Sequence, residues 1–276
     1  MANYTAADIK ALREQTGAGM LDVKKALDEA GGDKTKATEL LRIKGLKGVT
    51  KREGRSATNG LVAARAENGV GTLVEINCET DFVAKGAKFL ALADQVLEQA
   101  VRIEAADVET LLSSTLEDGR TVKELLDDAN ATIGEKIEVR RVAHLEGDNV
   151  VSYLHKTSPD LPAQIGVLVV TEGGDGQVAR DVAMHVAAFA PSFLHRHEIS
   201  ADTVENERRV AEATAKEEGK PEAALPRIVE GRLNGFFKEQ VLTEQAFAKD
   251  QKKSVAQVLE EAGAEAKAFA RFRVGG

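Results

Sequence analysis

The chain has 276 residues, of which 43% are hydrophobic and 30% are charged, so we expect two or three packed modules. Its formal net charge of -8 argues against a nucleic-acid-binding protein, which concentrates positive charge to neutralise phosphates. No apolar run is long enough to cross a membrane, and residues 1–10 lack the pattern of a signal peptide. With a lone cysteine, Cys78, these features predict a cytoplasmic protein.

Residues 1–45 predict three short helices that form a small head. Thr5 followed by Asp8 is typical of a capping box, and Asp33 can cap the third helix. The residues expected to face inward recur at helical spacing and are Ile9, Leu12, Val23, Ala26, Leu27, Ala30, Ala37, Leu40, Leu41 and Ile43.

Residues 46–59 predict a linker. The glycine-interrupted stretch around them has a basic composition that is typical of a solvated connection. Its basic residues are Lys44, Lys47, Lys51, Arg52 and Arg55. A contact with RNA is the alternative role for this segment.

Residues 60–146 predict a first core subdomain. The apolar period changes to two from residue 60, and Asn68 with Gly69 forms a strong hairpin signal. The expected elements are strands over 61–67 and 70–77, helices over 86–101 and 121–131, and a strand over 136–146.

The loop between the second strand and the first helix holds Thr80, Asp81, Phe82 and Val83. The helix over 86–101 has an apolar face of its own, which includes Leu90, so Phe82 is free to contact a partner. The alternative is that Phe82 covers the core and Asp81 complements the helix dipole.

Residues 147–276 predict a second subdomain with the same order of elements, interrupted by a helical hairpin over 202–240. The expected elements are strands over 150–155, 165–171 and 268–274, a helix over 177–190, and hairpin helices over 202–218 and 226–239. We therefore predict an α+β fold with two related antiparallel sheets.

The chemistry of an enzyme is not evident. His195 and His197 follow Pro191 in an expected loop, so we predict no metal site there. The glycines of residues 173–176 lack the spacing of a phosphate-binding loop, and we predict no cofactor. Cys78 is expected to be a buried, inert thiol because nearby carboxylates disfavour the thiolate.

Six segments, in order along nearly the whole chain, closely resemble the elongation factor Ts family. They are residues 15–27 (QTGAGMLDVKKAL), 77–85 (NCETDFVAK), 137–147 (IEVRRVAHLEG), 183–188 (AMHVAA), 229–232 (VEGR) and 271–275 (RFRVG). The resemblance implies a UBA-like head, a coiled-coil hairpin, and a nucleotide exchange factor without bond-making chemistry of its own. It also implies elongation factor Tu as partner, in a heterodimer or higher assembly, with GDP release as the outcome.

The resemblance implies that Thr80, Asp81, Phe82 and Val83 form the tip that enters the partner and displaces its Mg²⁺. Further partner contacts are implied for Arg13, Met20, Leu21, Lys24, Ile133 and His155. Several alternatives stay open. Met20 and Leu21 could simply pack the head, and His155 could be an ordinary solvated residue. A contact at Ala248 and Lys249 is not carried over, and residues 156–164 form a longer turn than in some relatives.

Two other functions compete with nucleotide exchange. The head and the hairpin could make the chain a non-catalytic adaptor that binds other proteins, and a ribosome-associated RNA binder is a third possibility. The net charge of -8 disfavours nucleic acid as a partner.

Overall fold

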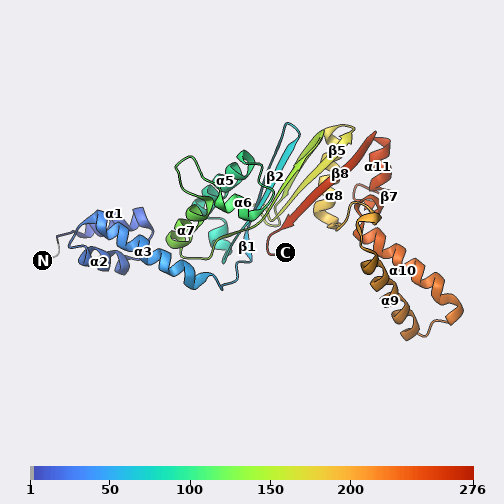
Figure 1. Ribbon diagram of the computed structural model, residues 1–276, viewed down its shortest axis with the longest axis horizontal. Coiled ribbons are helices and arrows are strands. Elements are labelled where there is room, and N and C mark those ends of the chain that lie inside the picture. The colour runs from blue at the N-terminus through green and yellow to red at the C-terminus, as the bar shows by residue number, and fades with distance from the viewer. Residues whose placement is uncertain (1–2) are drawn as a thin grey trace.

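The computed structural model describes residues 3–276, except for the side chains of residues 46, 47, 50 and 51. The molecule is elongated, with the head at one end, the sheets in the middle and a helical pair projecting at the other end (Figure 1). Eleven α-helices and three antiparallel sheets occur in the described residues, which confirms the α+β class. None of the helices in this range combines the length and apolar character needed to span a bilayer.

Three helices form the head, as predicted: α1 (Ala6–Thr16), α2 (Met20–Glu29) and α3 (Lys34–Arg52). Thr5 and Asp8 make the predicted capping box, and the Asp33 carboxylate accepts hydrogen bonds from the amides of Thr35 and Lys36 at 2.9 and 3.1 Å. The buried centre is Leu12, Val23, Ala26, Leu27, Ala37 and Leu41. Ile43 was predicted to face inward, but its side chain is 46% exposed because α3 turns this face away from the other two helices.

The linker prediction for residues 46–59 was wrong in its first half, because α3 continues to Arg52. The reason is a close contact between α3 and α7 (Val122–Ile133). A Cβ atom at Gly45 would lie 2.7 Å from that of Ala131, so the glycine permits helix packing here and does not end the helix. Arg42 adds an ion pair of 3.2 Å to Asp128 on α7.

The described basic residues of this segment have partners within the protein. Lys44 pairs with Asp22, Arg52 donates to the carbonyl of Asn130 at 2.9 Å, and Arg55 pairs with Glu79 at 3.2 Å. The side chains of Lys47 and Lys51 lie outside the described part of the structure. The expectation of solvated charge is confirmed for Lys44 and Arg55, whose side chains are 60% and 51% exposed, whereas Arg52 is half-buried.

The first subdomain is a three-stranded sheet of order β1-β2-β3, covered on its outer face by helices. Asn68 and Gly69 have φ angles of 53° and 79°, which confirms the predicted hairpin turn. The elements are β1 (Asn59–Glu67), β2 (Val70–Cys78), α4 (Asp81–Ala84), α5 (Ala87–Arg102), α6 (Val108–Ser113), α7 and β3 (Glu138–Glu146). Of these, α4 and α6 were not predicted.

The second subdomain repeats this order with β4-β5-β8. Its sheet and outer helices are β4 (Asn149–His155), β5 (Ile165–Gly173), α8 (Gly176–Phe189), α11 (Val255–Glu261) and β8 (Ala264–Arg273). A two-stranded sheet of β6 (Ala246–Phe247) and β7 (Asp250–Ser254) was not predicted. Short 3₁₀ turns occur at Arg196–Glu198, Glu222–Ala224 and Leu242–Glu244.

Between α8 and β6, the helices α9 (Ala201–Glu217) and α10 (Leu225–Gln240) pack side by side and project from the second subdomain (Figure 1). Their shared apolar contact is small, with Ala211, Val229 and Leu233 buried. Arg232 also donates to both carboxylate oxygens of Glu218, at 2.8 and 2.7 Å.

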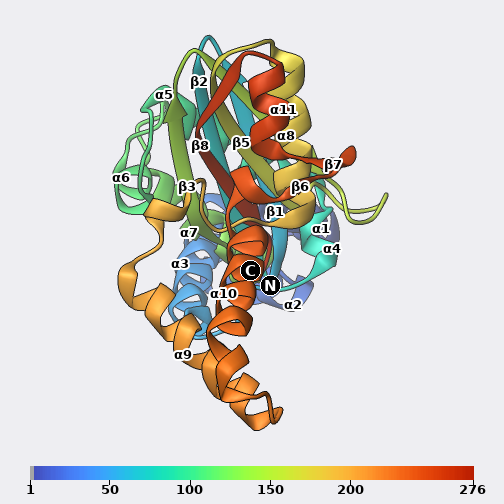
Figure 2. The ribbon, with the colours of Figure 1, turned by 90° about the vertical axis from the view of Figure 1, so that its right-hand side faces the viewer.

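The two sheets pack face to face through Val62, Leu73 and Leu168. Figure 2 shows α5 and α6 on one side of the paired sheets and α8 and α11 on the other. The core is thus four layers thick, and β2 and β5 are buried almost throughout.

The approach of the two sheets depends on Gly166. A Cβ atom there would lie 2.4 Å from Val62 Cγ1 and 2.8 Å from Leu73 Cδ1. We expect Gly166→Val to lower the free energy of unfolding by about 1 to 3 kcal/mol, because the extra atoms overpack a dense interior. Urea denaturation measures this change. Gly231→Ala on α10, which meets nothing within 4 Å, should not destabilise the protein, since alanine is the better helix former.

His185 predicts a pH dependence of stability. It is fully buried, its Nε2 lies 2.8 Å from Gln245 Oε1, and its Nδ1 accepts the amide of Ala248 at 3.1 Å. This arrangement requires a neutral ring, and burial lowers the pKa of His185 below its usual 6.5.

As the pH falls, the unfolded chain therefore binds a proton at His185 at a higher pH than the folded chain does. We expect full stability above about pH 6.5 and a loss of at most about 1.4 kcal/mol per pH unit from this residue as the pH falls below it. Urea midpoints between pH 7.5 and 5.5 test this. His185→Gln should flatten the slope, whereas His197→Gln should leave it unchanged; equal slopes in all three proteins would contradict the assignment.

Candidate functional site

The loop after β2 forms a short helical tip. Thr80 is the N-cap of α4, and its hydroxyl accepts the amide of Val83 at 3.3 Å. Ala84 is buried and Val83 packs against the core of the first subdomain. The tip is thus anchored on its inner side, while Asp81 and Phe82 lie on its outer side.

Glu135, at the turn between α7 and β3, holds the start of this tip. Its carboxylate accepts the amides of Glu79 and Thr80 at 3.1 and 3.0 Å and the hydroxyl of Thr80 at 2.6 Å. Hydrogen bonds to a charged acceptor are stronger than neutral ones. The neighbouring Glu79 accepts the amide of Lys136 at 2.6 Å, and this bond lowers the pKa of Glu79. These contacts fix the tip to the end of α7.

Phe82 is 76% exposed, so it does not cover the hydrophobic core. The Lys85 ammonium lies 4.7 Å from the centre of its ring and 3.2 Å from Asp81 Oδ2. An exposed phenylalanine on an anchored helix is available for another protein. The interpretation of Phe82 as a core residue is therefore wrong.

Cys78 lies beneath the tip and is buried. Its thiol donates to the carbonyl of Thr80 at 3.2 Å. Burial, with a smaller effect of the Glu135 carboxylate, raises the pKa of Cys78 to about 12. The predicted burial of Cys78 is confirmed, and its low reactivity stays a prediction; burial contributes more to the pKa shift than the nearby Glu79 and Asp81 do.

A groove of about 500 Å³ runs between the tip and the second subdomain. Lys85 and Leu90 line one side, and Leu154 and Lys156 line the other. Leu90 was predicted to be buried, but it is 37% exposed and Leu154 is 42% exposed. Lys85, three residues after Phe82, thus lines the same groove as Leu154 and Lys156, which flank His155. His155 is an exposed residue at the end of β4. The Tyr153 hydroxyl lies 3.2 Å from His155 Nδ1.

The predicted contact residues of the head are on its surface. Met20 and Leu21, at the start of α2, are 58% and 75% exposed, so the alternative that they pack the head is wrong. Arg13 and Lys24 are also exposed. In Figure 2, α1 and α4 lie on the same side of the molecule.

Ile133 differs from these surface residues. It is the last residue of α7 and is half-buried against the core of the first subdomain. It lies two residues before Glu135 and one after Thr132, whose Cγ2 would be 3.0 Å from a Cβ atom at Gly17 of the head. The end of α7 therefore connects the head to the tip.

Two further segments have structural contacts. Lys249 pairs with Asp181 at 2.7 Å, and the amide of Ala248 is bound by His185. The turn over residues 156–164 lines the groove with Pro159, Leu161 and Pro162. Sequence reasoning missed Glu135, Leu90 and Leu154 as parts of this site.

A rigid tip with an exposed aromatic residue, beside an apolar groove, is typical of a protein that binds another protein. Comparisons with known proteins identify the family within this class. A family model described as elongation factor TS matches residues 79–276. Relatives named elongation factor Ts cover all of this chain: those of Pseudarthrobacter chlorophenolicus, Kocuria rhizophila and Micrococcus luteus are 63%, 62% and 61% identical, each over its full length. The chain belongs to the elongation factor Ts family and has the role of a translation elongation factor.

Proposed function

We propose that the chain binds elongation factor Tu in its GDP-bound form and promotes release of GDP, so that GTP can bind. The observation that carries this proposal is the exposed Phe82 beside Asp81 on a tip that Glu135 holds in place. The chain itself makes or breaks no bond. It acts in the cytoplasm, where its partner meets the ribosome.

The mechanism follows from how a GTPase binds its nucleotide. Tight GDP binding depends on backbone donors around the phosphates and on Mg²⁺. By thermodynamic reciprocity, a partner that weakens GDP binding must itself be weakened by GDP to the same extent. The factor therefore binds best to a distorted, nucleotide-poor GTPase.

In this mechanism Phe82 enters an apolar gap between helices of the GTPase. Burial of a phenylalanine side chain contributes about 1.5 to 3 kcal/mol, which favours the distorted state. Asp81 disturbs the hydrogen bonds around the Mg²⁺ site and so displaces the ion. Thr80 and Val83 shape and anchor the tip, consistent with their contacts to Glu135 and to the core.

The remaining contacts extend the interface over the same side of the molecule. Arg13, Met20, Leu21 and Lys24 of the head meet the nucleotide-binding part of the GTPase. His155 and the groove beside it meet a second surface, and the assembly is a heterodimer or a higher assembly of such pairs. Ile133, being half-buried, acts partly through the position of the tip.

The chain has a head, a connecting segment, two core subdomains and an arm. We assign residues 1–45 to a UBA-like head, 60–146 and 147–276 to two core subdomains, and 202–240 to an inserted coiled-coil arm. Residues 46–59 connect the head to the core, by the end of α3 and a short segment after it.

Stopped-flow release of fluorescent GDP from elongation factor Tu tests the proposal. We expect the chain to accelerate release by orders of magnitude and to form a stable complex with the nucleotide-free GTPase. Complex formation without acceleration would favour the adaptor function. Binding to ribosomes that falls steeply with salt, without any effect on GDP release, would favour the RNA-binding function.

A further inference from the structure

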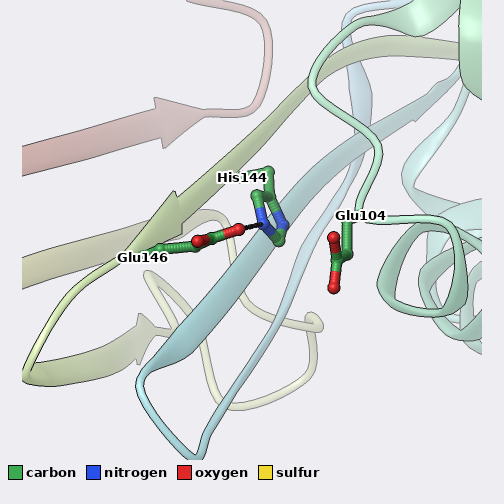
Figure 3. Close-up of side chains that lie close together, drawn as sticks. All are labelled: Glu104, His144 and Glu146. Atoms are coloured by element: carbon green, nitrogen blue, oxygen red, sulfur yellow. Dashed lines mark hydrogen bonds and ion pairs between the residues drawn. The ribbon is translucent and has the colours of Figure 1, made fainter.

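Three side chains with metal-binding groups meet beside β3, toward the end of β2 that is opposite the tip. Glu104, His144 and Glu146 each offer one ligand atom, and these atoms lie within 4.8 Å of one another. Figure 3 shows the imidazole ring of His144 between the two carboxylates. Glu146 is two residues from His144 on the same strand, whereas Glu104 comes from the segment after α5.

His144 lacks a partner that its burial requires. Its side chain is only 10% exposed, and its Nε2 lies 2.9 Å from Glu146 Oε1. Its Nδ1 is buried and has no hydrogen-bond partner among the described residues. Thr72 lies directly opposite His144 across the β2 and β3 pair, and its buried hydroxyl also lacks a partner in the described part of the chain. Buried polar atoms are rarely left unpaired, so two on facing residues indicate a missing polar group between them.

The hydrogen bond to Glu146 prepares the ring for a metal. A neutral imidazole carries one N–H and one lone pair. Donation from Nε2 to the carboxylate leaves the lone pair on Nδ1. Metal-binding histidines usually donate their other N–H to a carboxylate or carbonyl, which orients the ring and increases its basicity.

We propose that His144 Nδ1 and the Glu104 carboxylate bind one divalent transition-metal cation of the Zn²⁺ class, with water completing the coordination and Glu146 orienting the ring through its hydrogen bond to Nε2. An imidazole beside a carboxylate suits Zn²⁺ and its neighbours, whereas Mg²⁺ and Ca²⁺ prefer ligand sets made of oxygen alone. Glu104 is exposed, so its carboxylate can close over the ion from solvent. The bound ion ties the segment after α5 to β3, an edge strand of its sheet.

Competition between the full-length, untagged chain and a chromophoric zinc chelator tests the site, with Zn²⁺ alone as the probe. We expect one Zn²⁺ per chain. Glu104→Gln and His144→Gln should each weaken binding by about tenfold or more, since each removes a ligand. Excess Mg²⁺ should not compete. Glu104 is exposed, so its variant tests the site even if His144→Gln fails to fold.

The matched control is the double variant His195→Gln and His197→Gln. These two rings stack with their centres 5.3 Å apart. They form a pair of histidines outside the proposed site that could also attract zinc. The control should bind Zn²⁺ as the unaltered chain does. No binding by the unaltered chain, binding that survives both Glu104→Gln and His144→Gln, or binding that is lost in the control would each overturn the proposal.

Discussion

Phe82→Ala is expected to reduce the acceleration of GDP release by at least about tenfold, because truncation of a central aromatic contact costs about 2 to 4 kcal/mol. The ring is 76% exposed in the free protein, so the stability of the chain itself should barely change. Asp81→Ala should also slow exchange, with a larger share of the loss at high Mg²⁺ concentration. Stopped-flow measurements over a range of Mg²⁺ concentrations separate the two variants.

Met184→Ala is the matched control for Phe82. Met184 lies on α8 of the second subdomain and is 36% exposed, so its truncation removes a surface apolar group outside the tip. This variant should exchange nucleotide normally. If Phe82→Ala were as active as the control, the chain could still be an exchange factor, but the tip would not be its acting part.

Glu135→Gln should also cause a large loss, although Glu135 is a positioning residue that we expect to stay outside the GTPase. Its carboxylate accepts three hydrogen bonds from Glu79 and Thr80, each worth about 1.5 to 3 kcal/mol because the acceptor is charged. A neutral amide cannot accept all three equally well, so the tip samples other positions. We expect exchange to slow by about tenfold or more.

Hydrogen exchange of the amides of Glu79, Thr80 and Val83, each of which has a hydrogen-bond acceptor, distinguishes this role from direct contact. In Glu135→Gln these amides should exchange faster in the free protein, whereas in Phe82→Ala they should stay protected. Glu138→Gln removes a nearby carboxylate that pairs with Lys136 at 2.9 Å and serves as the control. Unchanged protection of the tip in Glu135→Gln would contradict the positioning role.

Local signals made most of the fold predictable. The Asn68 and Gly69 turn and the alternating strands around it depend on neighbours in the sequence, as does the capping box at Thr5. The short elements α4, α6, α11, β6 and β7 were missed because runs of two to seven residues are too short to show a clear apolar period. For α3, the glycine at 45 indicated a break, and only the contact with Ala131 reveals why the helix continues.

The candidate site was predictable only where a local sequence signal indicated it. The apolar face of the following helix left Phe82 free for a partner without excluding a core role, and the resemblance of residues 77–85 to the elongation factor Ts family then indicated Asp81 and Phe82. Glu135 binds the tip from 55 residues away, and no local pattern relates the two segments. Leu90 fits the helical period of a core residue, yet it is 37% exposed and lines the groove, which distant residues such as Leu154 and Lys156 complete.

The continuity of α3 has a consequence for affinity. A flexible connection would allow the head many positions relative to the tip. The effective concentration of the head near a second site on the GTPase would then fall as the connection lengthened. Here one helix carries the head, and its contact with α7 fixes the distance between the head and the tip. In the proposed complex, docking of the head brings the tip to its contact surface, because the entropy of holding the two at this distance was lost when the chain folded.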